Sequence, residues 1–157
     1  TIHIFFFFFQ EEAVLPTINS RTQIISFPQN LPYLEIFLLD EGLLKTQASL
    51  IARLVSSQEE AKRLATNKSF IDLLDQAKKF TELLLTDSNR AYLQVGVLVS
   101  LAVEKAEQGR LFDVLSLLLA ERLTEMIARE KMDAVLKAKK MWQANVSLQN
   151  CLEYLTM

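Results

Sequence analysis

The stretch RAYLQVGVLVSLAVE, residues 90–104, decides the fold class because it is long, apolar and uninterrupted by charge. No charged residue occurs at the thirteen positions between Arg90 and Glu104. A helix that is apolar on all sides is typical of a central helix that neighbours cover on several faces. Thirteen residues are too few to span a bilayer, which takes about 20. We therefore predict that a helix over residues 90–107, separated from the next by Gly109, is the most buried one.

The residues around this stretch have the three- and four-residue spacing of helices that bury one face. Three Gly and three Pro in 157 residues also favour helix over a turn-rich β fold. We expect six or seven helices over residues 32–157, with Ser57 and Ser69 as N-caps and with Asn145 and Asn150 as weak points. Besides residues 90–107, which residues 86–89 would cap, the expected helices span residues 33–40, 43–55, 57–67, 69–85, 111–127 and, as one long helix, 130–155.

The first 31 residues differ in composition from the rest, since all three prolines lie at or before position 32. Ile2–Phe9 is a continuous apolar run of strand length, and Thr22–Phe27 is a second strand candidate that could pair with it. The alternative is an extended arm, or a piece that folds only with a partner. The prediction is a mainly α chain, either a right-handed helical repeat or a helical bundle (residues 32–157), with a short N-terminal extended or β segment (residues 1–31).

The phenylalanine run is the main candidate for partner binding. In an extended chain, successive side chains point to opposite faces, and a small domain has difficulty covering both. An uncovered face or strand edge would bind a protein or peptide partner, and could make the chain an oligomer or a complex subunit. The candidate partner-binding residues are Phe5, Phe6, Phe7, Phe8, Phe9, Lys137 and Lys140.

The two lysines come from the densest basic region of the chain. Between residues 121 and 140 there are six basic and four acidic residues, a mixture that favours a salt-bridged surface over a site for an acidic ligand. Over the whole chain the net charge is −2, so the basic excess that nucleic-acid binding needs is missing. We predict no nucleic-acid partner.

Several other functions are disfavoured by what the sequence lacks. His3 and Cys151 are single residues of their types, so neither a zinc cluster nor an internal disulfide is expected, and a reducing, cytoplasmic setting fits. The three glycines are isolated, so no phosphate-binding loop is expected. The eight residues of Ile2–Phe9 are too few for a membrane span, and no Lys or Arg precedes them as in a secretory signal. We predict no cofactor and no enzyme activity.

Part of the chain resembles an armadillo or HEAT repeat over residues 33–120. Two segments offset by 47 residues, with Leu54 equated with Leu101, carry the likeness, while Asn67 and Lys68 stand where the family has a glycine. The matching residues are Ala48, Leu50, Leu54, Ser56, Ser57, Glu60, Leu64, Asn67, Phe70, Leu73 and Leu74 in the first copy, and Val97, Leu98, Leu101, Ala102, Leu111, Val114, Leu115 and Leu118 in the second. This resemblance implies a helical surface that binds protein partners.

Residues 93–155 also resemble a microtubule-interacting and trafficking domain. The matching residues are Ala102, Glu104, Glu107, Gly109, Leu111, Val114, Leu115, Leu117, Leu118, Lys137, Ala138, Lys139, Leu152, Glu153, Tyr154 and Leu155. The family usually has alanine at position 114 and a tyrosine near position 118. This resemblance implies a three-helix bundle that holds short peptides beside its third helix.

Three function classes follow from the sequence. The first, which we favour, is a non-enzymatic protein-interaction module built on packed helical hairpins. The second is a structural subunit of a larger assembly or a peptide-binding trafficking adaptor, and the third is an enzyme whose site the sequence does not reveal.

Overall fold

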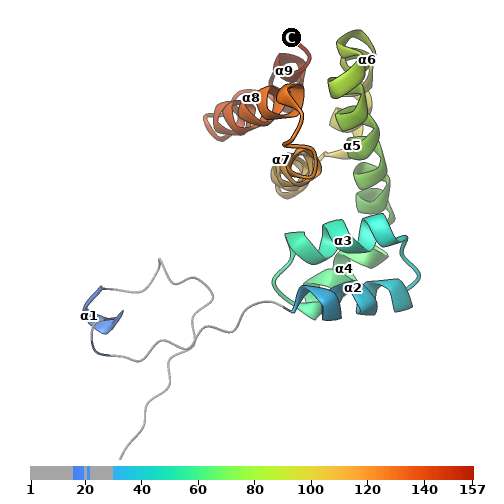
Figure 1. Ribbon diagram of the computed structural model, residues 1–157, viewed down its shortest axis with the longest axis vertical. Coiled ribbons are helices and arrows are strands. Elements are labelled where there is room, and N and C mark those ends of the chain that lie inside the picture. The colour runs from blue at the N-terminus through green and yellow to red at the C-terminus, as the bar shows by residue number, and fades with distance from the viewer. Residues whose placement is uncertain (1–15, 20, 22–29) are drawn as a thin grey trace, which may run out of the picture.

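The computed structural model describes residues 16–19, 21 and 30–157, and it confirms a mainly α chain (Figure 1). Within those residues there is no strand, and the two expected strands, Ile2–Phe9 and Thr22–Phe27, lie outside the described residues. The helices are α1 (Pro16–Asn19), α2 (Leu31–Asp40), α3 (Lys45–Leu54), α4 (Gln58–Thr66), α5 (Lys68–Thr86), α6 (Ser88–Leu101), α7 (Lys105–Ala120), α8 (Met126–Gln143) and α9 (Leu148–Leu155).

The long helix α5 connects the parts of the fold. Helices α2, α3 and α4 form a group at one end, α5 and α6 pack as a hairpin, and α7, α8 and α9 lie beside that hairpin (Figure 1). Helix α5 packs against α3, α4, α6, α7 and α8, and eight of its residues are buried. Its position makes α5 the central helix of the described chain.

The prediction that residues 90–107 form the most buried helix is wrong. Helix α6 buries four residues, half as many as α5, because it packs mainly against α5 and α9 and has its outer side open. Leu98 is fully buried, whereas Leu93 on the other side is 76% exposed. A sequence that is apolar all round makes burial on every side favourable, but it does not supply the neighbours that would cover each side.

The predicted end of this helix is also wrong, since α6 ends at Leu101 and α7 begins at Lys105. The Gln108 side-chain amide donates to the carbonyl oxygens of Ala102 (3.1 Å) and Val103 (3.4 Å), and it so satisfies backbone acceptors beyond the end of α6. Gly109 therefore lies inside α7 and separates no helices. A side chain there would meet Trp142, whose ring carbon Cη2 would lie 3.3 Å from an added Cβ.

The N-cap predictions have mixed outcomes. Ser57 caps α4 as predicted, with its hydroxyl oxygen 3.2 Å from the Glu60 backbone nitrogen. Ser69 is not a cap, because the Asn67 side chain accepts from the Phe70 backbone nitrogen and starts α5 two residues earlier. Asn and Ser are comparable N-caps, so residue type alone does not distinguish these positions. Asp87 caps α6, as expected from residues 86–89.

The expected single helix over residues 130–155 is two helices, α8 and α9. The break lies at Asn145, one of the two predicted weak points, where φ is +68° and the chain takes a left-handed turn that asparagine tolerates better than most residues. Ser147 then caps α9 by accepting from the backbone nitrogen of Asn150, the other predicted weak point, which stays helical. Residues 31–157 accordingly form eight helices instead of six or seven.

Candidate interaction surface

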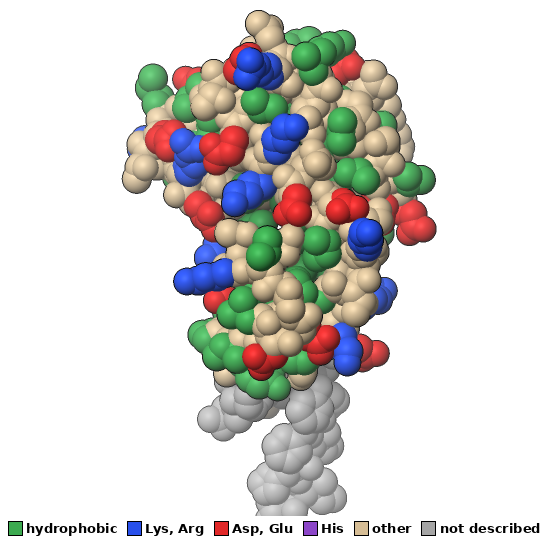
Figure 2. All heavy atoms as spheres, turned by 90° about the vertical axis from the view of Figure 1, so that its right-hand side faces the viewer, with side chains coloured by type: hydrophobic (Ala, Val, Ile, Leu, Met, Phe, Trp, Pro, Cys, Tyr) green, Lys and Arg blue, Asp and Glu red, His purple; other side chains and the backbone are tan. Residues whose placement is uncertain are grey.

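The open side of α6 forms an uncharged apolar surface, which we call the α6 outer face. The residues of this face are Tyr92, Leu93, Gly96, Val97 and Ser100, all exposed, with 53% of Tyr92, 76% of Leu93 and 40% of Val97 accessible. Val103, just beyond the helix, is 73% exposed. Figure 2 shows the side of the molecule that α5 and α6 form, where apolar side chains reach the surface among polar ones. Exposed apolar side chains grouped on one helix are typical of an interaction surface.

The inner side of α6 explains why this face points outward. Gln94 is buried, and its side-chain nitrogen donates to the Gln76 side-chain oxygen of α5 at 2.5 Å. A buried amide needs such a partner, and the bond fixes the rotation of α6 on α5. Gln94 therefore takes a place in the core, and Leu93 lies outside.

Gly96 lies in the middle of the α6 outer face, and no contact among the described residues requires a glycine there. It has no positive φ, and an added Cβ would meet nothing within 4 Å. Glycine in a helix costs about 0.5–1 kcal/mol relative to alanine because its unfolded backbone is freer. The packing of residues 30–157 would therefore accept alanine in place of this glycine.

We expect Gly96→Ala to raise the free energy of unfolding by about 0.5–1 kcal/mol, measured by urea unfolding. Gly109→Ala is the matched control, because it also replaces a helical glycine but places its Cβ against Trp142. That ring is held by Phe112 and by a 2.9 Å hydrogen bond to Gln108, so this second variant should lose stability. Equal gains in both variants would contradict the packing of Trp142 on α7.

Two further groups of apolar side chains are exposed. One lies on α2 and the connection to α3, and consists of Tyr33, Ile36, Leu39 and Leu44. Beside it, the starts of α2 and α4 enclose an open pocket of about 180 Å³, smaller than the roughly 300–1,000 Å³ of small-molecule sites. The other group lies on α8 and the loop before it, and consists of Leu123, Met126, Ile127 and Leu136.

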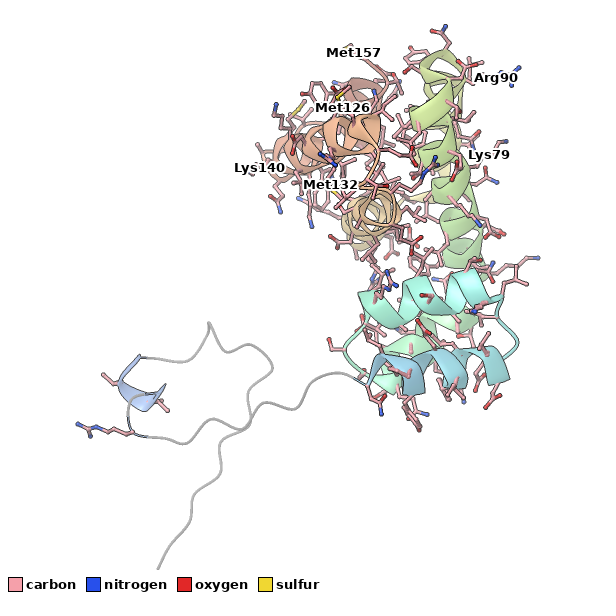
Figure 3. All side chains as sticks on the ribbon, in the orientation of Figure 1. Lys79, Arg90, Met126, Met132, Lys140 and Met157 are labelled. Atoms are coloured by element: carbon pink, nitrogen blue, oxygen red, sulfur yellow. The ribbon has the colours of Figure 1, made fainter. Side chains whose placement is uncertain are left out.

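The predicted site residues are not brought together into one described site. Phe5, Phe6, Phe7, Phe8 and Phe9 lie outside the described residues. Lys137 and Lys140 are exposed on α8, and Figure 3 shows Lys140 on the side of the molecule away from α5 and α6.

The expected salt-bridged surface is confirmed at two of the basic residues between 121 and 140. Lys139 donates to Asp113 of α7 at 2.5 Å. Arg122 pairs with Glu125 at 2.7 Å and with Glu82 of α5 at 2.8 Å. These carboxylates raise the pKa of Arg122, which is ionised in any case.

The described residues offer neither a metal centre nor a membrane span. In that part of the chain, no group of three or more His, Cys, Asp or Glu side chains could hold a metal ion. None of the helices described there combines the length and the apolar character that a membrane crossing takes.

Cys151 is fully buried in α9, and burial raises the pKa of its thiol because the thiolate loses its solvation. We expect native Cys151 to react with a disulfide reagent such as dithionitrobenzoate at least about 100-fold more slowly than the same residue in the urea-unfolded chain. Absorbance of the released thiolate measures both rates. A native rate equal to the unfolded rate would contradict the packing of α9.

No protein-family model, curated protein or solved structure matches this chain. The armadillo-like and trafficking-domain resemblances therefore stay predictions.

The α6 outer face could not be recognised in the sequence because the small and polar residues of α6 do not all lie on one side of the helix. Gln94 is buried, whereas Gly96 and Ser100 are exposed. A signal was present in the four-residue spacing of Gly96 and Ser100, which places two small residues on the same side of a helix.

Proposed function

We propose that this chain is a non-enzymatic module that binds another polypeptide, and that the α6 outer face is its contact surface. The observation that carries the proposal is the 76% exposure of Leu93 on a helix face without charge. Leaving large apolar side chains in water is unfavourable by about 25 cal/mol per Å², so a partner that covers them gains this free energy. A reducing, cytoplasmic setting and binding without metal, nucleotide or nucleic acid are part of the proposal.

The shape of the surface favours a helix as the bound element. The outer side of α6 is convex, and two helices pack by placing the side-chain ridges of one into the grooves of the other. Gly96 has no side chain and Ser100 has a small one, so a second helix can approach closely between Leu93 and Tyr92. An amphipathic partner helix with its apolar side toward α6 fits these features.

Site-specific photocrosslinking in cells that express the full chain tests this function. A photoreactive amino acid at position 93 should give adducts with a polypeptide, identified by mass spectrometry, in several-fold higher yield than the same group at position 79. Lys79 is an exposed polar residue of α5 (Figure 3), so it reports random encounters. With the purified partner, Leu93→Glu should weaken binding at least about tenfold, since it would bury a charge. Equal crosslinking yields at positions 93 and 79 would refute the proposal.

A further inference from the structure

We propose that the helix that packs on α6 is α6 of a second copy of this chain, antiparallel to it about a two-fold axis near Val97. The inference rests on the proposed function, because it names the partner of the same α6 outer face. Two further features of this face lead to it, the position of its small residues and the charges at its two ends.

The small residues lie where a two-fold axis would need them. Gly96 is at the middle of the apolar stretch, has open space around its Cβ position, and shares its side of the helix with Ser100. In an antiparallel pair centred near Val97, Gly96 of each copy lies opposite the small-residue side of the other, and the two backbones can approach closely. Leu93 of each copy then packs beside this contact, where it leaves water.

The charges at the ends of the apolar stretch select the antiparallel arrangement. Arg90 lies in the first turn of α6 with 76% of its side chain exposed, and Glu104 is exposed just beyond the last turn. Val97 is midway between them in the chain, so antiparallel pairing brings Arg90 of one copy to Glu104 of the other, twice. A parallel pair would place like charges together. In the antiparallel order, the partially positive N-terminal end of each helix also lies beside the partially negative C-terminal end of the other, which is favourable.

The other charged groups near these ends are compatible with the pairing. Asp87 lies 3.5 Å from Arg90 in the same chain, which leaves the exposed guanidinium free to contact a second carboxylate. The Lys105 ammonium lies over the Trp142 ring, 5.9 Å from its centre, and so on the side of α8. Glu107 is occupied at the start of α7, where its carboxylate accepts from the Glu104 backbone nitrogen.

The size of the contact sets the expected affinity. A single pair of helices with a few apolar side chains per copy lies at the low end of specific interfaces, so a dissociation constant of about 1–100 μM is expected. Sedimentation equilibrium of the full chain from about 1 to 200 μM covers this range. The expected result is a reversible monomer–dimer equilibrium.

Gly96→Leu separates association from folding. Its side chain would enter open space on the monomer, so thermal unfolding of the dilute protein should be unchanged or shifted upward. The same side chain would hold the two helices apart, and the dimer should weaken at least about tenfold. Ile36→Glu is the control, because Ile36 is 59% exposed on α2, away from α6. It should leave the dimer intact.

A charge exchange tests the antiparallel order. Arg90→Glu and Glu104→Arg should each weaken the dimer about three- to tenfold, because each single variant changes both symmetric Arg90–Glu104 pairs. The double variant should restore the dimer, because opposite charges face each other again. Thermal unfolding of each dilute variant verifies that its monomer is folded, and Glu104→Lys, which keeps the exchanged positive charge, replaces Glu104→Arg if that variant is not.

Three results would overturn the self-pairing. They are a wild-type chain that stays monomeric to about 200 μM, an equal loss of dimer in Ile36→Glu and Gly96→Leu, and a double variant that fails to restore the dimer. If the adduct at position 93 holds a different polypeptide and the chain is monomeric, the self-pairing is wrong while the proposed function stands. If position 93 gives no adduct above position 79, both are wrong.

Discussion

Phe80→Ala is expected to lower the free energy of unfolding by about 3–5 kcal/mol, the range for removing a large aromatic side chain from a core. Phe80 is fully buried on α5, the helix that packs against the most other helices of the described chain. The loss combines the transfer of the ring to water with the cavity that its neighbours cannot fill. Urea unfolding followed by circular dichroism measures it.

Phe80→Leu is the matched control for this variant. It keeps most of the volume, and volume-conserving changes in cores usually cost less than about 1.5 kcal/mol. A loss below about 1.5 kcal/mol for Phe80→Ala itself would mean that α5 is not at the centre of the core.

The second large effect is a contrast between the two sides of α6. Leu98→Ala should cost about 2–5 kcal/mol because Leu98 is fully buried, whereas Leu93→Ala should cost less than about 1 kcal/mol because most of Leu93 is already in water. The two leucines share residue type and helix, and each lies inside α6, which spans Ser88–Leu101. Both variants are measured at submicromolar concentration, below the dissociation constant expected for the dimer, where association contributes little. Equal losses would show that α6 is covered on both sides.

The helical character of this chain was predictable because it depends on local properties. The caps at Ser57 and Asp87 and the weak point at Asn145 each follow from hydrogen bonds or backbone angles within a few residues. The Asn67 cap was missed because two suitable residues, Asn67 and Ser69, lie two positions apart, and in the fold the Asn67 side chain accepts from the Phe70 backbone nitrogen. Local signals locate a helix, but not always its first residue.

The position of α6 could not be predicted from its own residues. Which side of an apolar helix stays open depends on where distant helices pack, and Gln76 and α9 determine it here. The end of α6 likewise depends on Gln108, whose side-chain amide donates to the carbonyl oxygen of Ala102, six residues earlier in the chain. The candidate surface was missed for the same reason, since exposure is a property of the assembled fold.

The hydrogen bond between Gln108 and Trp142 also lets tryptophan fluorescence report on the end of α6. The Gln108 side-chain nitrogen donates to the carbonyl oxygens after α6. Its side-chain oxygen accepts a hydrogen bond from the indole nitrogen of Trp142 on α8, at 2.9 Å. Trp142 is the single tryptophan of the sequence, so the tryptophan fluorescence of the protein comes from the junction of α6, α7 and α8. A displacement at the end of α6 would change the polarity around that indole and shift its emission. The wavelength of that emission therefore reports movement at the edge of the candidate surface without any added label.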